Sequence, residues 1–137
     1  MNSKNTIFIR GNHDYTLFGK LSYTFVENDR VVHVTHGFQN DKGMTNPFAR
    51  LGVWLVGWVE KVFPNIENVF STSKLGDDIV KNTTAYATTL LKTGKYDQVV
   101  LGHTHNKGEF KCGAYLNCGT CQHGKFDYII IGDKDEN

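Results

Sequence analysis

The stretch "QVVLGHTH", residues 98–105, joins a short apolar run to a glycine and two histidines. A short apolar run followed by a glycine turn is typical of a buried β-strand and its end. The same pattern occurs in "VVHVTHG" (31–37) and in "TIFIRGNHD" (6–14). In each stretch, glycine lets the backbone approach closely while the strand fixes where the next side chain points. We therefore expect three strand ends that carry histidines.

Further strands are predicted on both sides of these stretches. "YTFVEND" (23–29) is expected to be a strand, and the polar turn Glu27 to Arg30 joins it to the strand that ends at His36. "AYLNCGT" (114–120) and "KFDYIIIGD" (125–133) are interpreted as closing strands before a charged tail.

Two helices are predicted between the second and third histidine stretches. The first covers 47–63, with Pro64 as its stop, and its apolar stripe is Phe48, Leu51, Leu55, Val59 and Val62, extended by Trp54 and Trp58. The second runs from about Ser73 to Lys92, and Gly94 closes it. Because the polar chemistry lies where strands end, the pattern indicates an α/β domain with its site on strand-end loops.

Length and composition indicate one globular domain. The chain has 137 residues, of which 39% are hydrophobic, enough for a core. Its formal charge of +1 provides no overall field to recruit nucleic acid or an anionic membrane, so neither is predicted as a partner. The sequence shows neither a secretory signal nor an apolar run of about 20 residues, so we expect a cytoplasmic protein without a transmembrane segment. Three cysteines within 112–121 argue against a disulfide framework.

The histidine stretches together predict a metal site. Imidazole, amide oxygen and carboxylate are all metal ligands or proton carriers. In an extended backbone, His103 and His105 would lie on one side, with Thr104 turned away. A lone histidine is more often a surface or capped core residue, but four histidines at three strand ends favour a divalent metal, for which manganese, iron or zinc suits nitrogen and oxygen ligands.

The order "GNHD", "HG", "GHTH" resembles the second half of the calcineurin-like metallophosphoesterase signature. The resemblance implies an α/β two-sheet sandwich flanked by helices, and hydrolysis of a phosphate monoester, diester or pyrophosphate through two divalent ions that clamp the phosphoryl group. By position, Asn12, His36 and His103 match ligands of one metal, and His105 matches a ligand of the other. His13 matches the catalytic residue that contacts the phosphate and protonates the leaving oxygen.

In that family an Asp-x-His motif and a Gly-Asp motif come before the Gly-Asn-His-Asp/Glu element, and neither comes before "GNHD" in this sequence. We therefore expect 1–137 to be a single metallophosphoesterase domain that lacks its N-terminal strands, the C-terminal portion of a larger enzyme with impaired activity. An exposed sheet edge would favour self-association. Asp14 is interpreted as a hydrogen-bond acceptor that fixes its loop. Gln39, Asn40 and Asp41 are interpreted as a solvated loop, with pocket lining as the alternative.

A helical insertion, 42–94, is similar to the lid of the UDP-diacylglucosamine pyrophosphatase-like branch, where an apolar cap receives acyl chains. The alternative is that Trp54, Trp58 and their neighbours pack on the core. That branch has Gly-Asn-Arg-Asp where this chain has His13, the form of general phosphatases and phosphodiesterases. The substrate is expected to be a phosphorylated small molecule or a nucleotide- or lipid-linked phosphate.

Two other functions are open. One is a non-catalytic fragment or subunit that assembles with a complementary half. The other is a small zinc-stabilised binding module, because "CGAYLNCGTCQH" brings Cys112, Cys118, Cys121 and His123 within one short segment, although without a second Cys-x-x-Cys pair. The simpler interpretation of these cysteines is buried or half-buried thiols in the closing strands.

Overall fold

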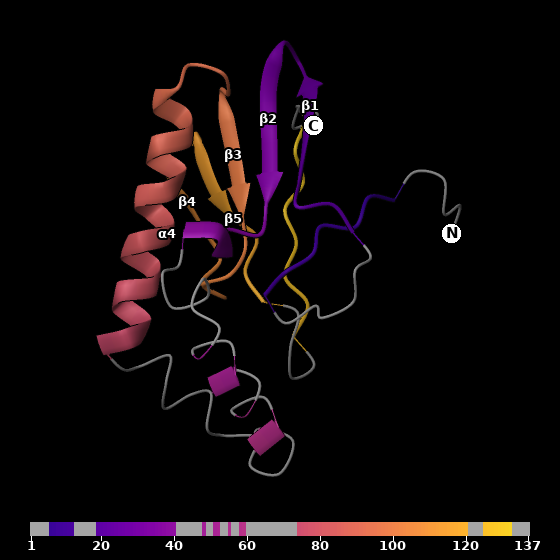
Figure 1. The fold of residues 1–137 in the computed structure, drawn as a ribbon. Helices are drawn as coiled ribbons and strands as arrows, with labels where there is room; N and C mark the ends of the chain where they lie inside the picture. Colours follow the sequence, from indigo (N-terminus) through magenta and orange to yellow (C-terminus); the bar gives the residue numbers. More distant parts are fainter. Residues whose placement is uncertain are drawn as a thin grey trace.

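The computed structural model describes residues 6–12, 19–40, 48, 51–52, 55, 58–59, 74–120 and 125–132. In this part of the chain, five strands form an open sheet in the order β1-β2-β3-β5-β4, and a long helix lies against it (Figure 1). The elements are β1 (Ser22–Glu27), β2 (Arg30–Thr35), the 3-10 turn η2 (Phe38–Asn40), α4 (Lys74–Lys92), β3 (Gln98–Leu101), β4 (Gly108–Phe110) and β5 (Tyr115–Asn117). The predicted α/β class is confirmed.

β1 and β2 form an antiparallel hairpin in which Glu27 pairs with Arg30. The two loop residues, Asn28 and Asp29, have positive φ angles of 50° and 59°. Positive φ at both central residues is the pattern of a type I′ turn, whose twist matches that of a hairpin, and Asn and Asp tolerate it. Both predicted strands and their polar turn are confirmed.

α4 connects β2 to β3, which lie side by side and run parallel. Gly94, with a φ of 68°, donates its N–H to the carbonyl of Leu91 at 3.1 Å and closes the helix as predicted. The threonines of α4 are accommodated because their hydroxyls bond back within the helix, as Thr88 Oγ1 does to the carbonyl of Thr84 at 2.8 Å. Among the helices that the structure describes, none is long and apolar enough to cross a membrane.

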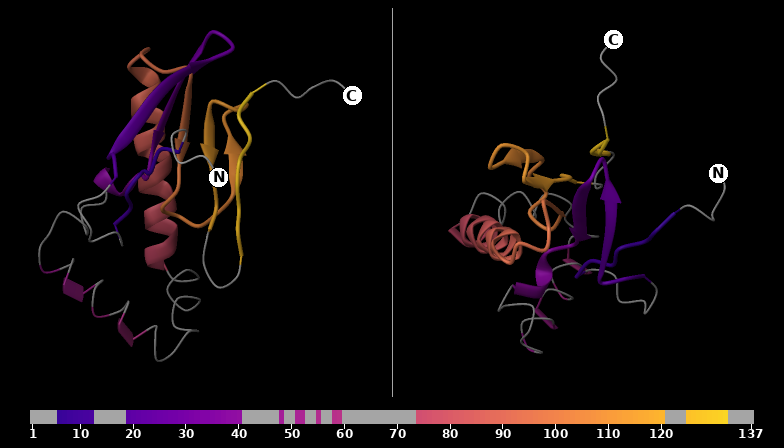
Figure 2. Two further views of the ribbon diagram at one scale, coloured as in Figure 1. Left: turned by 90° about the vertical axis from the view of Figure 1, so that its right-hand side faces the viewer. Right: turned by 90° about the horizontal axis from the view of Figure 1, so that it is seen from above.

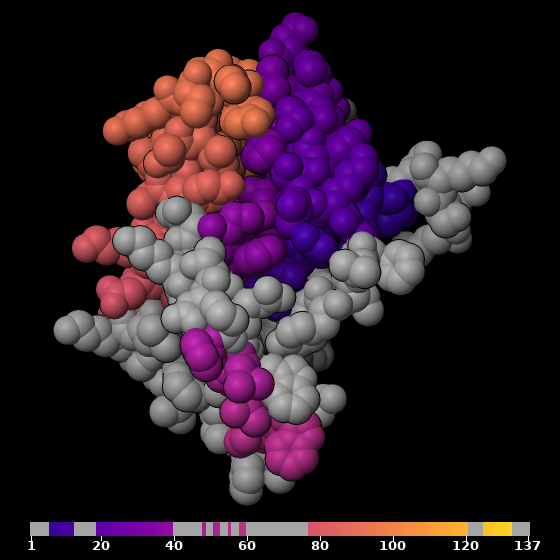
Figure 3. Space-filling model, viewed as in Figure 1, coloured from indigo at the N-terminus to yellow at the C-terminus, as the bar shows by residue number. Residues whose placement is uncertain are grey.

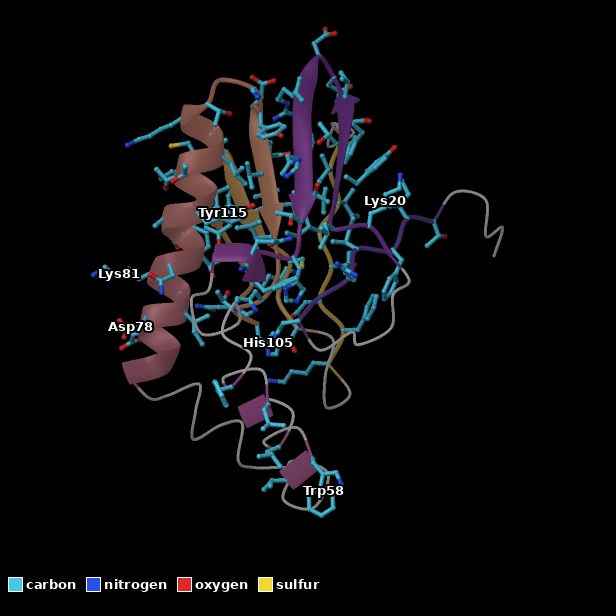
Figure 4. The ribbon with its side chains drawn as sticks, in the orientation of Figure 1. Lys20, Trp58, Asp78, Lys81, His105 and Tyr115 are labelled. Carbon is cyan, nitrogen blue, oxygen red and sulfur yellow. The ribbon has the colours of Figure 1, made fainter. Side chains whose placement is uncertain are left out.

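The core lies between α4 and the middle of the sheet. Ala87 of α4 packs with Val99, Leu101 and Tyr115, all of them almost inaccessible to solvent. Figure 4 shows Tyr115 between the helix and the sheet. All four residues of β3 are buried, as the apolar run predicted. α4 belongs to the predicted 42–94 insertion, so this half of the insertion covers the sheet as a crossover helix.

Three neighbouring strands, β2, β3 and β5, run parallel, so their carboxyl ends meet at one edge of the sheet. The residues that follow these ends are His36, Gly102 with His103, and Cys118. The downward arrowheads of the three strands in Figure 1 mark this edge. Ligand sites of α/β proteins form at such carboxyl ends.

The segment 125–132 is not the strand that its sequence predicts. It has no regular secondary structure, and among the described residues a backbone bond joins Asp127 N to the carbonyl of Thr120 at 2.9 Å. The segment runs along the side of the sheet away from α4 (Figure 2). The prediction was wrong because an apolar run is a strand only when a neighbouring strand pairs with it, which the local sequence does not determine.

The predicted strand Thr6–Arg10 is reduced to an isolated parallel bridge between Ile9 and Lys20. Two backbone bonds hold it, from Arg10 N to the carbonyl of Lys20 at 3.0 Å and from Lys20 N to the carbonyl of Phe8 at 2.9 Å. This contact fixes the path of the chain into Gly11 and Asn12.

Of the predicted helix 47–63, the structure describes residues 48, 51–52, 55 and 58–59, and all are helical. Phe48 and Trp58 are 82% and 62% exposed, and the described atoms of this segment lie at the molecular surface (Figure 3). Trp58 lies far from the sheet (Figure 4). Four described residues of the stripe, Phe48, Leu51, Leu55 and Trp58, are therefore exposed rather than packed in the core. Val59 is half-buried, and Trp54 and Val62 lie outside the described residues.

The burial of His33 in β2 leads us to expect that the free energy of unfolding depends on pH. This buried imidazole stacks on Tyr96, with ring centroids 4.3 Å apart, and its Nδ1 is hydrogen-bonded to Thr24 Oγ1 at 2.8 Å. Burial lowers the pKa of His33 from its ordinary value of 6.5, so below that pH the unfolded chain takes up a proton that the folded chain resists. The free energy of unfolding is expected to be highest above pH 6.5 and to fall as the pH drops toward the lowered folded-state pKa.

Urea unfolding followed by circular dichroism at several pH values between about 5 and 8 measures this dependence, since the charge of an ordinary histidine changes there. His33→Phe keeps a ring against Tyr96 and removes the titrating group. The pH slope of the variant should be smaller than that of the wild type, and equal slopes would show that the other histidines account for it.

Candidate functional site

The candidate site lies at the carboxyl ends of β2 and β3, where two predicted metal ligands meet. The ring centroids of His36 and His103 are 5.2 Å apart, with the ring planes inclined at 61°. The two turns are joined through the backbone, because Gly102 N donates to the carbonyl of His36 at 3.1 Å. The parallel pairing of β2 with β3 thus brings together histidines that are distant in sequence.

Gly11 brings the third histidine stretch to the same place. A Cβ atom built on Gly11 would lie 2.5 Å from Nε2 of His36 and 2.6 Å from its Cδ2. At this distance a Cβ atom would force the imidazole or the backbone to shift, so glycine is the residue that lets the backbone lie against the imidazole as it does. Asn12, half-buried, is the next residue. Three segments that were singled out from the sequence therefore converge on His36.

The loop of His103 and His105 differs from its prediction. Both residues have left-handed backbone conformations, with φ angles of 67° and 54°, so the stretch is a turn after the strand, and the condition of an extended backbone that would place both side chains on one side is not met. Thr104 N donates to the carbonyl of Gly102 at 2.8 Å, closing a tight turn around His103. His105 is exposed at the lower end of the sheet (Figure 4), and His103 is half-buried.

A buried asparagine that the sequence analysis did not select holds this loop. Asn117, 1% exposed, ends β5. Its Nδ2 donates to the carbonyl of Gly102 at 2.9 Å and to Oγ1 of Thr104 at 2.8 Å. Its Oδ1 accepts the N–H of Gly119 at 3.1 Å. The signal in the sequence was a polar residue at the end of an apolar strand, the same pattern that identified the histidines.

Gln39 holds the turn that carries His36. Its Oε1 accepts the N–H of Gly37 at 3.1 Å, and its Nε2 donates to Oγ1 of Thr35 at 2.9 Å. Nε2 also donates to the carbonyl of Leu21 at 3.3 Å. The side-chain amide is therefore occupied by bonds that fix the local chain. These contacts account for the position of the Gln39 side chain. Asp41 lies outside the described residues.

The cysteines do not form one cluster in the described part of the chain. Cys112 precedes β5 and Cys118 follows it, so the strand separates them at about 3.3 Å per residue. Burial, with the nearby carboxylate of Asp127, raises the pKa of the Cys118 thiol. The Cys118 thiol is therefore more readily kept protonated than an ordinary cysteine thiol. Cys121 and His123 lie outside the described residues.

The donors of the site fit a divalent metal in part. A metal–nitrogen distance of about 2.0–2.1 Å places the centroids of two tetrahedrally bound imidazoles roughly 5 Å apart, in agreement with the 5.2 Å between His36 and His103. The same separation is usual for rings in edge contact. Among the residues described, no group of three His, Cys, Asp or Glu side chains is arranged to hold an ion. An amide ligand such as Asn12 would be the third donor, and His13 and Asp14 lie outside the described residues.

Comparisons with protein-family models, with curated proteins and with solved structures gave no match for this chain.

Proposed function

We propose that this chain is a metal-dependent phosphoesterase whose site lies at the carboxyl ends of β2 and β3. The observation that carries the proposal is the convergence of Gly11, His36 and His103 from three distant segments. Glycine at position 11 lets the backbone approach the imidazole of His36 closely enough for the neighbouring Asn12 to serve the same site. The order of the motifs, which resembles that of calcineurin-like metallophosphoesterases, provides the reaction class.

His36 and His103 would bind one ion, with Asn12 as the amide donor, and His105 would face a second ion. Bound divalent ions would supply stabilisation of the charge on the phosphoryl oxygens and activation of water. His13 directly follows Asn12, and its role would be to donate a proton to the leaving oxygen, for which an imidazole with an ordinary pKa near 6.5 is suited. In this proposal the open sheet is one layer of a two-sheet sandwich.

Manganese-dependent hydrolysis of bis-p-nitrophenyl phosphate and p-nitrophenyl phosphate by the purified chain tests the proposal. His36→Ala and His103→Ala should each remove hydrolysis and weaken manganese binding, because each removes an imidazole donor. His33→Phe is the control. His33 lies in β2, the strand that leads to His36, but its ring stacks on Tyr96 and is not one of the proposed metal ligands. Equal hydrolysis by wild type and both alanine variants would show that these histidines do not catalyse it.

A second candidate is a subunit that assembles with a complementary half or with another copy of the chain. It is favoured by the alternating exposed side chains Phe126, Tyr128 and Ile130, which are 74%, 58% and 82% exposed. Such a row of apolar groups is typical of an interaction surface. Light scattering distinguishes the candidates. An active monomer would favour the enzyme as it stands, and an inactive oligomer or an activity gained on adding a partner would favour assembly.

A further inference from the structure

We propose that Asn117 is the positioning residue that sets the orientation of His103 and His105, an inference that rests on the metal site proposed above. Asn117 is deeply buried at the end of β5, and its side chain contacts the loop of the two histidines. Its place in the sheet explains how its side chain reaches the loop that follows β3. β5 pairs with β3, with Asn117 opposite Leu101, the last residue before Gly102.

The hydrogen bonds of Asn117 require an amide. The carbonyl of Gly102 can only accept a hydrogen bond, so the group facing it at 2.9 Å must be a donor. The N–H of Gly119 can only donate, so the group facing it at 3.1 Å must be an acceptor. An amide side chain provides both groups at once. An aspartate of the same shape would keep the acceptor and lose the donors.

The loop that Asn117 holds is strained. His103, with a φ of 67°, occupies a conformation that non-glycine residues seldom adopt, and His105 does the same at 54°. Such conformations are unfavourable for residues other than glycine, and they persist where surrounding contacts over-determine them. The carbonyl of Gly102 accepts both the Thr104 N–H, at 2.8 Å, and the Asn117 amide. Asn117 is thus the tertiary contact that favours the turn.

The expected consequence is a site that is pre-organised before any ion binds. Groups that orient metal ligands typically contribute 10–100-fold to metal affinity. Without the Asn117 amide, the Gly102 carbonyl loses its side-chain donor and the loop can relax toward unstrained backbone angles. His103 would then lose its fixed place beside His36.

Asn117→Asp is the variant that tests this, and Gln98→Glu is its matched control. Gln98 is also a buried amide, and its Nε2 donates at 2.7 Å to the carbonyl of Gly113, but at the start of β3 rather than at the site. Two readouts are used on the full chain. Amide hydrogen exchange of residues 103–105 without metal reports the loop, and titration with manganese alone reports the affinity.

Asn117→Asp is expected to speed exchange of the loop amides at least tenfold and to weaken manganese binding about 10–100-fold. Gln98→Glu should change neither, even where it lowers the thermal midpoint. Unchanged loop exchange in Asn117→Asp, or an equal change in Gln98→Glu, would overturn the inference. If the wild type binds no manganese while the loop still loosens, the proposed metal function fails and the positioning of the loop stands.

Thr104→Val decides the inference if Asn117→Asp does not fold. It removes only the Oγ1 that accepts from Asn117 at 2.8 Å, and it keeps the shape of the side chain. A smaller acceleration of loop exchange, in the same direction, is expected. Exchange identical to that of the wild type would count against Asn117 as the residue that holds the loop.

Discussion

The Gly11→Ala variant is expected to bind manganese at least about tenfold more weakly and to lose roughly 100-fold in hydrolysis, because its methyl group occupies the place of the His36 ring. The built Cβ lies 2.5 Å from Nε2 of His36, so either the ring or the backbone must move. The ring has little freedom to move, since it packs against His103 and Phe38 with centroids 5.2 and 5.7 Å away. A displacement near 1 Å at a reacting site can cost about 100-fold in rate.

Gly102→Ala is the control for this prediction, because Gly102 also lies beside His36. There the nearest His36 atom would be 3.9 Å from the new Cβ and the nearest atom of all, Sγ of Cys118, would be 3.5 Å away, which are ordinary contacts. Isothermal titration with manganese and the p-nitrophenyl phosphate assays compare the two variants. Equal behaviour of Gly11→Ala and wild type would show that the backbone of Gly11 does not lie against His36 in solution.

The sequence predicted the parts of the fold whose cause is local. Two strands, which end at Thr35 and Leu101, and the helix that Gly94 closes are examples. Each shows an apolar periodicity and an end signal within its own local sequence. The segment 125–133 has the same apolar character, yet its described part does not pair with a neighbouring strand. Pairing is a property of two segments, so one segment does not determine it.

The site shows the same division. The family resemblance implied that His36 and His103 would lie together at one metal, and their rings are in contact. It did not predict the left-handed backbone of His103 and His105, because that conformation depends on a tertiary bond from Asn117. Alternation of side chains along an extended chain was the wrong rule for a turn. The role of Gly11 could not be predicted either, because it depends on the imidazole of His36, which follows another strand.

Leu101→Ala is expected to lower the free energy of unfolding by about 2–5 kcal/mol, the usual cost of truncating a buried leucine. Leu101 is 0% exposed and packs with Ala87, Val99 and Tyr115 in the core, where a cavity would remain. A typical domain is stable by only about 5–15 kcal/mol, so the variant would lose a large share of its stability. Urea unfolding at pH 7.5, followed by circular dichroism, measures the change.

Leu21→Ala is the matched control, because Leu21 carries the same side chain at 48% exposure beside β1. Its truncation should cost well under half as much, since less apolar surface is removed from the interior. Leu101 also supports the site, because a Cβ on Gly37 would lie 3.7 Å from its Cβ and Cδ1. Manganese affinity should therefore fall in Leu101→Ala under conditions where the variant is still folded, and not in Leu21→Ala. Equal losses of stability in the two variants would show that the interior around Leu101 is not close-packed.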